Sequence, residues 1–419
     1  MMSKFCHYQE DKKLKKYRRI MTAVLVMMLA AGLVAGCSQK EEEPVQLVLE
    51  KIPEDDPALK PKPVEPEPVV EEVVEEEVEE TMEVPEGMYL SELTGLPISE
   101  DLRDQRPVAV MVDNEKIALD HFETAECDIV YEIMNSTAND RVTRLMCIRK
   151  DWKPIQQMGS IRSTRPTNIP LAAEYNAVLV HDGGPFYIND WLARSYARHL
   201  SGGFARIKNG KNYEFTEYIT NGELESRMKA AGYSETYDSA KPERDTHFIF
   251  GEYGTDYKLS ETDYATVKTA KDIKMPVFKH NQSELKYNES TGTYDYYEYG
   301  SIHKDGEDGE PLSFKNVLLQ NTTFSQLDEN GYLIYNMINT GDPRKGYYIT
   351  NGECVNVTWL KDSETAITKF FDENGDEIII NPGKTYIGLI PSDGWVRRRC
   401  GQGLLQRDPP SDPPEHFCP

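Results

Sequence analysis

The chain has 419 residues, a hydrophobic content of 39% and a formal net charge of −24 at pH 7. At roughly 150 residues per domain, this length allows two or three domains with ordinary hydrophobic cores. The acidic balance repels polyanions at long range, so the composition argues against a protein that binds nucleic acid.

The N-terminal segment has the layout of a secretion signal. Basic residues at 12–19 precede an apolar run at 20–35, which is shorter than the roughly 20 residues that a membrane-spanning helix needs. The run ends in VAGC, which resembles the lipobox of bacterial lipoproteins. This resemblance implies a lipoprotein signal peptide over residues 1–37, in which signal peptidase cleaves before Cys37 and the Cys37 thiol becomes lipidated. The alternative is an uncleaved anchor helix, and in both cases we expect the rest of the chain on the extracytoplasmic face of the cell membrane.

Residues 38–86 form an acidic, proline-rich segment. They contain 4 Lys and Arg against 18 Asp and Glu, a local charge of −14. Low hydrophobicity and repulsion between like charges keep such segments extended and disordered. We therefore predict a spacer that holds a folded domain away from the lipid surface.

The pattern of a folded domain begins at about residue 87. Apolar runs that end in turn residues predict buried strands at 106–114, 128–134, 142–148 and 177–180. A short helix is predicted at 168–175, between the third and fourth of these strands. The recurrence of strand, turn and short helix predicts a mixed α/β domain over residues 87–255.

The second half of the chain is rich in hairpin signals. Asn-Gly pairs at 330–331, 351–352 and 374–375 lie beside β-branched and aromatic residues, and Asn-Gly is a strong signal for a tight hairpin. Residues 256–395 therefore predict a predominantly antiparallel β domain. The whole chain is predicted to have an α+β fold, with the mixed α/β domain followed by the β-rich domain.

Two other features complete the chain. Residues 396–419 contain three arginines, a Gly-Gln-Gly and two Pro-Pro pairs, match neither pattern, and are interpreted as an atypical tail produced by a frameshift. Cys127 and Cys147 are either small core side chains or a bridge between neighbouring strands.

Several motifs in order resemble one family. They are RPVAVMVDN, DIVYE, GSIRSTRP, YNAVLVHDGGP, YGSIHKDGE, GECVNVTWLK and DENGDEIIINPGKTYIGLIP. This series over residues 90–395 resembles the YerB-like bacterial lipoproteins, which implies a two-part extracytoplasmic domain of unknown biochemical function. The chain departs from the family in MGSIRS, where members often carry GPVRS, and in the loss of the final strand after Trp395.

One positive island stands out in this acidic chain. Residues 141–210 contain 11 Lys and Arg against 4 Asp and Glu, a local charge of +7. Arginine suits the recognition of carboxylate or phosphate because its planar fork donates two parallel hydrogen bonds. The arginines of this island are Arg141, Arg144, Arg149, Arg162, Arg165, Arg194, Arg198 and Arg206.

We predict an anion site at loops that follow buried strands, where ligands tend to bind in α/β sheets. Its predicted residues are Arg144, Arg162, Arg165 and His181. In the alternative interpretation the arginines form structural ion pairs, which also concentrate charge. The carboxylates available for such pairs are Asp113, Asp128, Glu132 and Asp182.

These observations predict a lipid-anchored surface protein that binds an anionic cell-wall or lipid-phosphate ligand, or an envelope protein. The alternative is an envelope enzyme acting on phosphate-linked glycans or lipids, in which Arg162 and Arg165 stabilise developing negative charge. The signatures GxSxG, HExxH and GxxxxGK[ST] are absent. Hydroxyls in the loop, such as Ser160, could act as nucleophiles only if His181 reached them as a base.

No cofactor and no metal site is predicted. His303 and Asp305 are two residues apart in a glycine-containing stretch, and we interpret that stretch as a hairpin tip.

Overall fold

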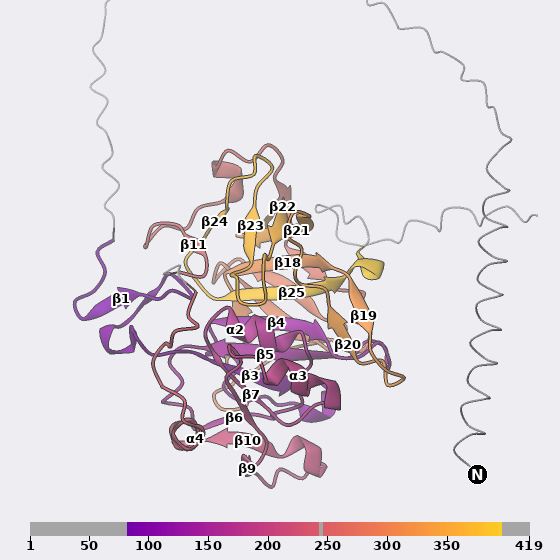
Figure 1. Ribbon diagram of the computed structural model, residues 1–419. Coiled ribbons are helices and arrows are strands. Elements are labelled where there is room, and N and C mark those ends of the chain that lie inside the picture. The colour runs from indigo at the N-terminus through magenta and orange to yellow at the C-terminus, as the bar shows by residue number, and fades with distance from the viewer. Residues whose placement is uncertain (1–81, 243–245, 396–419) are drawn as a thin grey trace, which may run out of the picture. The chain divides into compact units, whose positions relative to one another are not determined.

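The computed structural model describes residues 82–242 and 246–395 (Figure 1). The predicted signal peptide with Cys37, the spacer up to residue 81 and the tail at 396–419 lie outside the described residues. In the described part of the chain, no helix has the length and apolar character needed to cross a membrane.

An eleven-stranded mixed sheet forms the centre of the fold. In spatial order its strands are β12 (Lys268–Thr269), β22 (Glu353–Leu360), β21 (Arg344–Thr350), β18 (Asn316–Thr322), β25 (Thr385–Pro391), β4 (Ile129–Met134), β5 (Thr143–Arg149), β3 (Val108–Asp113), β7 (Val178–His181) and β8 (His199–Ser201), while β23 (Lys369–Phe371) pairs with β22. Neighbours are parallel in the pairs β18–β25, β25–β4, β3–β7 and β7–β8, and antiparallel elsewhere.

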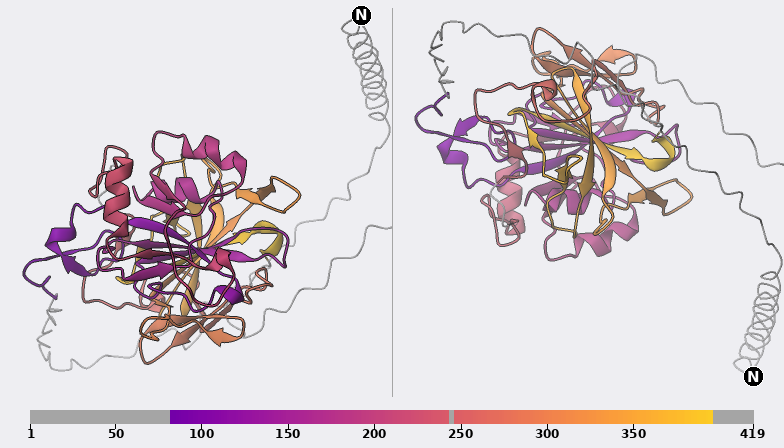
Figure 2. Two further views of the ribbon diagram at one scale, coloured as in Figure 1. Left: turned by 90° about the horizontal axis from the view of Figure 1, so that it is seen from below. Right: turned by 90° about the horizontal axis from the view of Figure 1, so that it is seen from above.

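The central sheet joins the two halves of the chain. β25 lies between β18 and β4, with Thr385 opposite Ile129 and Leu389 opposite Ile133. Strands from early and late parts of the chain lie side by side in all three ribbon views (Figures 1 and 2). The fold is mostly β, in several sheets, and the predicted α/β half and β half do not form separate sheets. Apolar runs report that a strand is buried, and they do not report which strand it pairs with.

Several smaller sheets surround the central one. They are β1 (Met88–Leu90) with β2 (Pro97–Ser99); β6 (Gln157–Gly159), β10 (Glu217–Thr220) and β9 (Ala205–Arg206); β13 (Asp272–Lys274), β14 (Glu284–Asn288), β15 (Thr293–Glu298) and β16 (Ser301–Ile302), with β17 (Ser313–Phe314) on β15; β19 (Phe324–Gln326) with β20 (Leu333–Tyr335); and β11 (Ile249–Phe250) with β24 (Ile379–Ile380).

The predicted Asn351-Gly352 hairpin is confirmed. Thr350 pairs with Glu353, so Asn351 and Gly352 alone connect β21 to β22. Their φ angles of 49° and 74° are both positive, which is the backbone of a type I′ turn and the reason that Asn-Gly favours it.

The helices are short and lie beside the sheets. They are α2 (Asn168–Ala173), α3 (Asn189–Leu192) and α4 (Glu223–Ala231), together with the 3-10 turns η2 (Glu100–Leu102), η3 (Lys116–Ala118), η4 (Phe186–Ile188), η5 (Tyr213–Phe215), η6 (Leu259–Glu261) and η7 (Ser392–Gly394). The helix predicted at 168–175 is α2, whose residues are all buried and which packs on β7.

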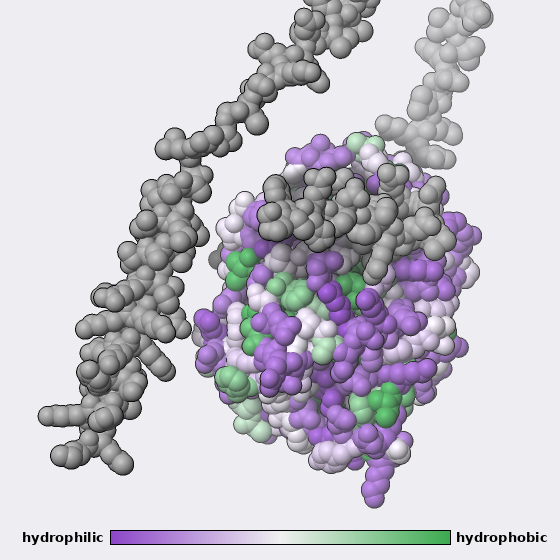
Figure 3. All heavy atoms as spheres, turned by 90° about the vertical axis from the view of Figure 1, so that its right-hand side faces the viewer, coloured by the Kyte–Doolittle hydropathy of each residue, from purple (hydrophilic) through white to green (hydrophobic). Residues whose placement is uncertain are grey.

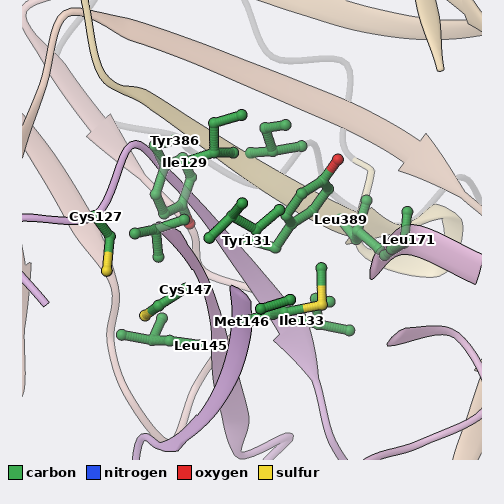
Figure 4. Close-up of a cluster of buried hydrophobic side chains, with 14 of the residues drawn as sticks. Cys127, Ile129, Tyr131, Ile133, Leu145, Met146, Cys147, Leu171, Tyr386 and Leu389 are labelled. Atoms are coloured by element: carbon green, nitrogen blue, oxygen red, sulfur yellow. The ribbon is translucent and has the colours of Figure 1, made fainter. Parts of the chain in front are cut away.

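The hydrophobic core lies on both faces of the central strands. All six residues of β4 and all seven of β5 are buried, as expected for strands covered on both sides. Figure 4 shows part of this core, with side chains from β4, β5, α2 and β25 in one cluster. Cys127 and Cys147 lie within it as free, buried cysteines. The interpretation as core side chains therefore holds, and the bridge is not formed.

A buried ion pair also links the halves. Lys361, directly after β22, places Nζ 2.8 Å from Oε2 of Glu174 at the end of α2, and both side chains are fully buried. Thr368 donates to the same carboxylate oxygen through its hydroxyl at 2.8 Å, and the Tyr131 hydroxyl donates to Oε1 at 3.0 Å. Burial raises the pKa of Glu174, but the charges of Lys361 and His247 and the hydrogen bonds from Lys361 and Thr368 together outweigh it, and the pKa falls below its ordinary value.

We expect Lys361→Met to lower the free energy of unfolding by roughly 3–5 kcal/mol, because it leaves the Glu174 carboxylate buried without a cation. The double variant Glu174→Gln/Lys361→Met should recover part of this loss. The measurement is chemical denaturation followed at two wavelengths, with the exposed Lys369→Met as control. An equal, small effect of both lysine substitutions would contradict the expectation.

Candidate functional site

The predicted site residues lie at one edge of the central sheet. β3 and β7 are parallel, so their carboxyl ends, Asp113 and His181, meet at the same edge. β5 is antiparallel to β3 and places Arg144 opposite Asp113. Ligands tend to bind outside the carboxyl ends of such strands, so the location agrees with the predicted type of site.

The loop at 160–165 is fixed to this edge by its backbone. The Arg162 amide donates to the Met111 carbonyl in β3 at 2.9 Å, and the Arg162 carbonyl accepts from the Asp182 amide at 3.0 Å. The Thr164 amide donates to the Gly183 carbonyl at 3.1 Å. Gly183 has a φ of +64°, a conformation that glycine adopts at low cost. These bonds hold the arginines of the loop between β3 and the turn after β7.

Two of the predicted arginines converge on Asp113, whose side chain is 1% exposed. Arg162 Nε lies 2.5 Å from Asp113 Oδ2, and an Arg144 terminal nitrogen lies 3.7 Å from the same oxygen. Arg144 also donates to the Ser163 carbonyl at 2.9 Å, and Arg162 pairs with Glu214 at 3.0 Å. Burial alone would lower the pKa of Arg162, but the two carboxylates outweigh it and raise the pKa above its ordinary value.

Most other arginines of the island also have carboxylate partners. The pairs are Arg141–Asp393, Arg149–Glu123, Arg194–Glu364, Arg198–Asp238, and Arg206 with both Asp182 and Glu217. Several of these carboxylates come from distant parts of the chain. The local charge of +7 is therefore largely neutralised in the fold, as the ion-pair interpretation expects.

Arg165 differs from its neighbours because no ion pair joins it to a carboxylate of the described residues. The side chain is 5% exposed. One terminal nitrogen donates to the Thr164 carbonyl at 2.8 Å, while Nε has no hydrogen-bond partner. The guanidinium carbon lies 3.8 Å from the centroid of the Tyr332 ring. Burial, reinforced by the positive charge of Arg144, lowers the pKa of Arg165 from 12.5 to about 9, so the guanidinium is charged and poorly compensated at neutral pH.

His181 does not join the arginines. Its Nδ1 lies 2.8 Å from the Gly183 carbonyl, which assigns the proton to Nδ1, and its Nε2 then accepts from His199 Nδ1 at 3.2 Å. Burial lowers the pKa of His181 to about 4, so the ring is neutral at pH 7. Both ring nitrogens are engaged, and neither contacts the Ser160 hydroxyl, which is buried without a partner.

No local pattern in the sequence connects Arg165 with Tyr332. This tyrosine lies in the loop between β19 and β20, which follows β18. Nearby, the Tyr187 hydroxyl donates to Asp328 at 3.1 Å, and both groups act on the pKa of Arg165. Arg165 and Tyr332, like Tyr187 and Asp328, are more than 140 positions apart in the chain. The order of the strands in the sheet brings these pairs to one edge.

The fold and the site define a β-rich protein whose mixed central sheet carries a cluster of arginines at one edge. Residues 93–234 match the family model described as "Protein of unknown function (DUF3048) N-terminal domain", and residues 273–387 match "Protein of unknown function (DUF3048) C-terminal domain". Together the two matches span more than half of the chain, and the protein belongs to this YerB-like family.

Comparison with individual proteins agrees with this family assignment. The chain is 22% identical over 335 residues to "Putative lipoprotein YerB" of Bacillus subtilis (strain 168), covering 74% of this chain and 89% of that protein. A crystal structure of the Bacillus subtilis YerB protein matches with a TM-score of 0.60 and 20% identity, over 73% of this chain and 98% of that one. The structural likeness shows a shared fold, and the predicted resemblance to YerB-like proteins is confirmed.

We expect the buried His181 to make the protein sensitive to acid. Because its pKa is lower in the folded state than the ordinary 6.5, the unfolded state binds more protons between pH 6.5 and about 4. The contribution of neutral His181 to the free energy of unfolding is fully present above pH 6.5 and is lost as the pH falls towards 4. This change amounts to about 3 kcal/mol.

His181→Asn should flatten this part of the stability curve, since an amide can donate to the Gly183 carbonyl without titrating. The measurement is urea denaturation at pH 7.0, 6.0, 5.0 and 4.5, with the partly exposed His280→Asn as control. If the His181→Asn protein lost stability with acid as steeply as the unsubstituted protein, His181 would not be the responsible group.

Proposed function

We propose that this protein is a lipid-anchored surface protein whose folded part binds an anionic component of the cell envelope through Arg165. The observation that carries the proposal is a buried guanidinium without a carboxylate partner among the described residues. The relative named a lipoprotein supports lipid attachment at Cys37, and the acidic spacer would hold the folded part away from the membrane.

The free edge of Arg165 suits an anion. One terminal nitrogen is occupied by the Thr164 carbonyl, whereas Nε has no partner and the other terminal nitrogen makes no hydrogen bond to a described residue. These two nitrogens form the edge of the guanidinium that donates parallel hydrogen bonds to a carboxylate or phosphate. Because an uncompensated buried charge is costly, a bound anion would stabilise this group more than it would stabilise an exposed arginine.

Aromatic side chains border the guanidinium. Tyr332 stacks on it at 3.8 Å, which fixes its plane. Phe186, in the turn after Gly183 and Gly184, is 83% exposed and contacts Tyr187 edge-to-face. Tyr187 in turn acts on the pKa of Arg165, so these rings belong to the surroundings of the guanidinium. Such surroundings suit a ligand that joins an anionic group to a sugar or an apolar chain, as cell-wall polymers and lipid phosphates do.

The competing functions have less support. An envelope enzyme would need an acid or base beside Arg165, whereas His181 is engaged with Gly183 and His199, and Asp328 accepts from Tyr187. A scaffold for another envelope protein would present a large apolar patch. The face drawn in Figure 3 is largely hydrophilic, with hydrophobic residues in small separate groups. Neither a nucleic acid nor a cofactor is part of the proposal.

The test compares Arg165→Met with Arg162→Met in the full chain. We expect Arg165→Met to leave the unliganded protein equally stable or more stable, because it removes a buried charge that lacks a counter-ion. Arg162→Met should cost roughly 3 kcal/mol, because it removes the nearest cation from Asp113. Chemical denaturation measures both values.

Binding is measured as the rise in melting temperature with a polyprenyl phosphate and with soluble anionic cell-wall fragments. A ligand at about 100 times its Kd adds about 2.7 kcal/mol of stability to a protein that binds it only when folded. We expect this rise in the unsubstituted protein and in the control variant Arg194→Met, whose arginine is exposed, and we expect its loss in Arg165→Met. A folded Arg165→Met protein with an unchanged rise would overturn the proposal.

A further inference from the structure

Three buried metal-ligand side chains meet at a place that the proposed anion site does not include. The segment around His121 runs beside the segment around Asp305, with a bridge between these two residues and a 2.6 Å bond from the Gly306 amide to the His121 carbonyl. This pairing brings His121 to Glu298, the last residue of β15, and to His303, which follows β16. One ligand atom from each of the three lies within 4.8 Å of the other two.

The cluster contains polar atoms that the protein leaves without partners. His121 is fully buried, and neither of its ring nitrogens makes a hydrogen bond. Oε2 of Glu298, a residue that is 2% exposed, also has no partner. Buried polar groups in native proteins are nearly always hydrogen-bonded or bound to water or an ion. A cation at this point would satisfy both side chains at once.

The contacts of His303 orient its ring for ligation. Its Nε2 lies 3.1 Å from the Thr124 hydroxyl, and that hydroxyl donates to Asp305 Oδ2 at 3.4 Å. On the other side of the ring, Nδ1 lies 2.7 Å from Oε1 of Glu298, and without a metal a proton on Nδ1 makes a hydrogen bond to this carboxylate. A metal that binds here would release this proton, and Nδ1 and the carboxylate would then become its ligands. An outer shell of this kind, a hydroxyl backed by a carboxylate, fixes the ring of many metal-binding histidines.

We propose that His121, His303 and Glu298 form a site for a divalent transition metal, with Zn²⁺ as the best-suited ion. Two imidazoles and one carboxylate are a ligand set that zinc uses, with a fourth position left for water. Calcium and magnesium prefer oxygen ligands alone. The metal would tie the β15–β16 hairpin to the segment that leads into β4. The stretch after His303 forms the predicted hairpin tip, with a bridge between Lys304 and Pro311, and in this proposal Asp305 supports the site through Thr124.

The experiment is a titration of the chelator-treated full chain with Zn²⁺, followed by calorimetry and by metal analysis after gel filtration. We expect one equivalent of tightly bound Zn²⁺ and a higher melting temperature, with no comparable response to Mg²⁺. His121→Gln and Glu298→Gln should each lose this equivalent or bind it at least about tenfold more weakly. His280→Gln, a partly exposed histidine outside the cluster, should bind as the unsubstituted protein does.

The proposal is overturned if the unsubstituted protein binds no stoichiometric Zn²⁺, or responds equally to Mg²⁺. It is also overturned if Glu298→Gln, with a native circular dichroism spectrum, binds Zn²⁺ with unchanged affinity. Glu298→Gln keeps the shape of the side chain, so it decides the question even if His121→Gln fails to fold. These outcomes are independent of the anion site, because Arg165 has no part in them.

Discussion

The parallel pairing of β4 with β25 is the constraint on which the rest of the structure depends. It joins residues 129–133 to residues 385–389, so the central sheet is complete only when both halves of the chain are in place. The same pairing sets β18 next to β25, and the loop after β18 carries Tyr332 to the sheet edge where β3 and β7 end. Arg165 contacts Tyr332 because β4 pairs with a strand that lies more than 200 residues later in the chain.

This constraint also determines how charge is distributed. The arginine-rich segment at 141–210 has few acidic residues of its own, and the fold supplies carboxylates from elsewhere, such as Glu214, Asp238 and Asp393. Burying a charge is costly unless it is paired, so an arginine-rich segment can enter the interior only with distant partners. Among the arginines of this segment, Arg165 is the one without an ion pair to a carboxylate of the described residues.

The sequence predicted what local patterns determine. The apolar runs located β3, β4, β5 and β7 because several apolar residues in a row indicate a buried strand. Asn351-Gly352 located a turn because two positive φ angles favour these residue types. Strand order was not predictable, since side-chain alternation specifies a face and not a partner. For the same reason, the sequence identified Arg162 and Arg165 as candidate site residues, but it could not show that Arg162 has a carboxylate partner and Arg165 does not. His121 and His303, 182 positions apart, shared no pattern at all.

Arg165, and His121 with Glu298, both lower the stability of the folded protein because each has buried polar atoms without hydrogen-bond partners. A buried donor or acceptor without a partner costs about 1–3 kcal/mol, and a whole domain is stable by only about 5–15 kcal/mol. Arg165, and His121 with Glu298, therefore consume a substantial share of the folding free energy while they remain unpartnered. In contrast, Arg162 and Asp113 lie at the same sheet edge and form an ion pair, with Nε 2.5 Å from Oδ2. The anion proposed for Arg165 would supply from outside the chain the negative charge that Asp113 supplies to Arg162 within it.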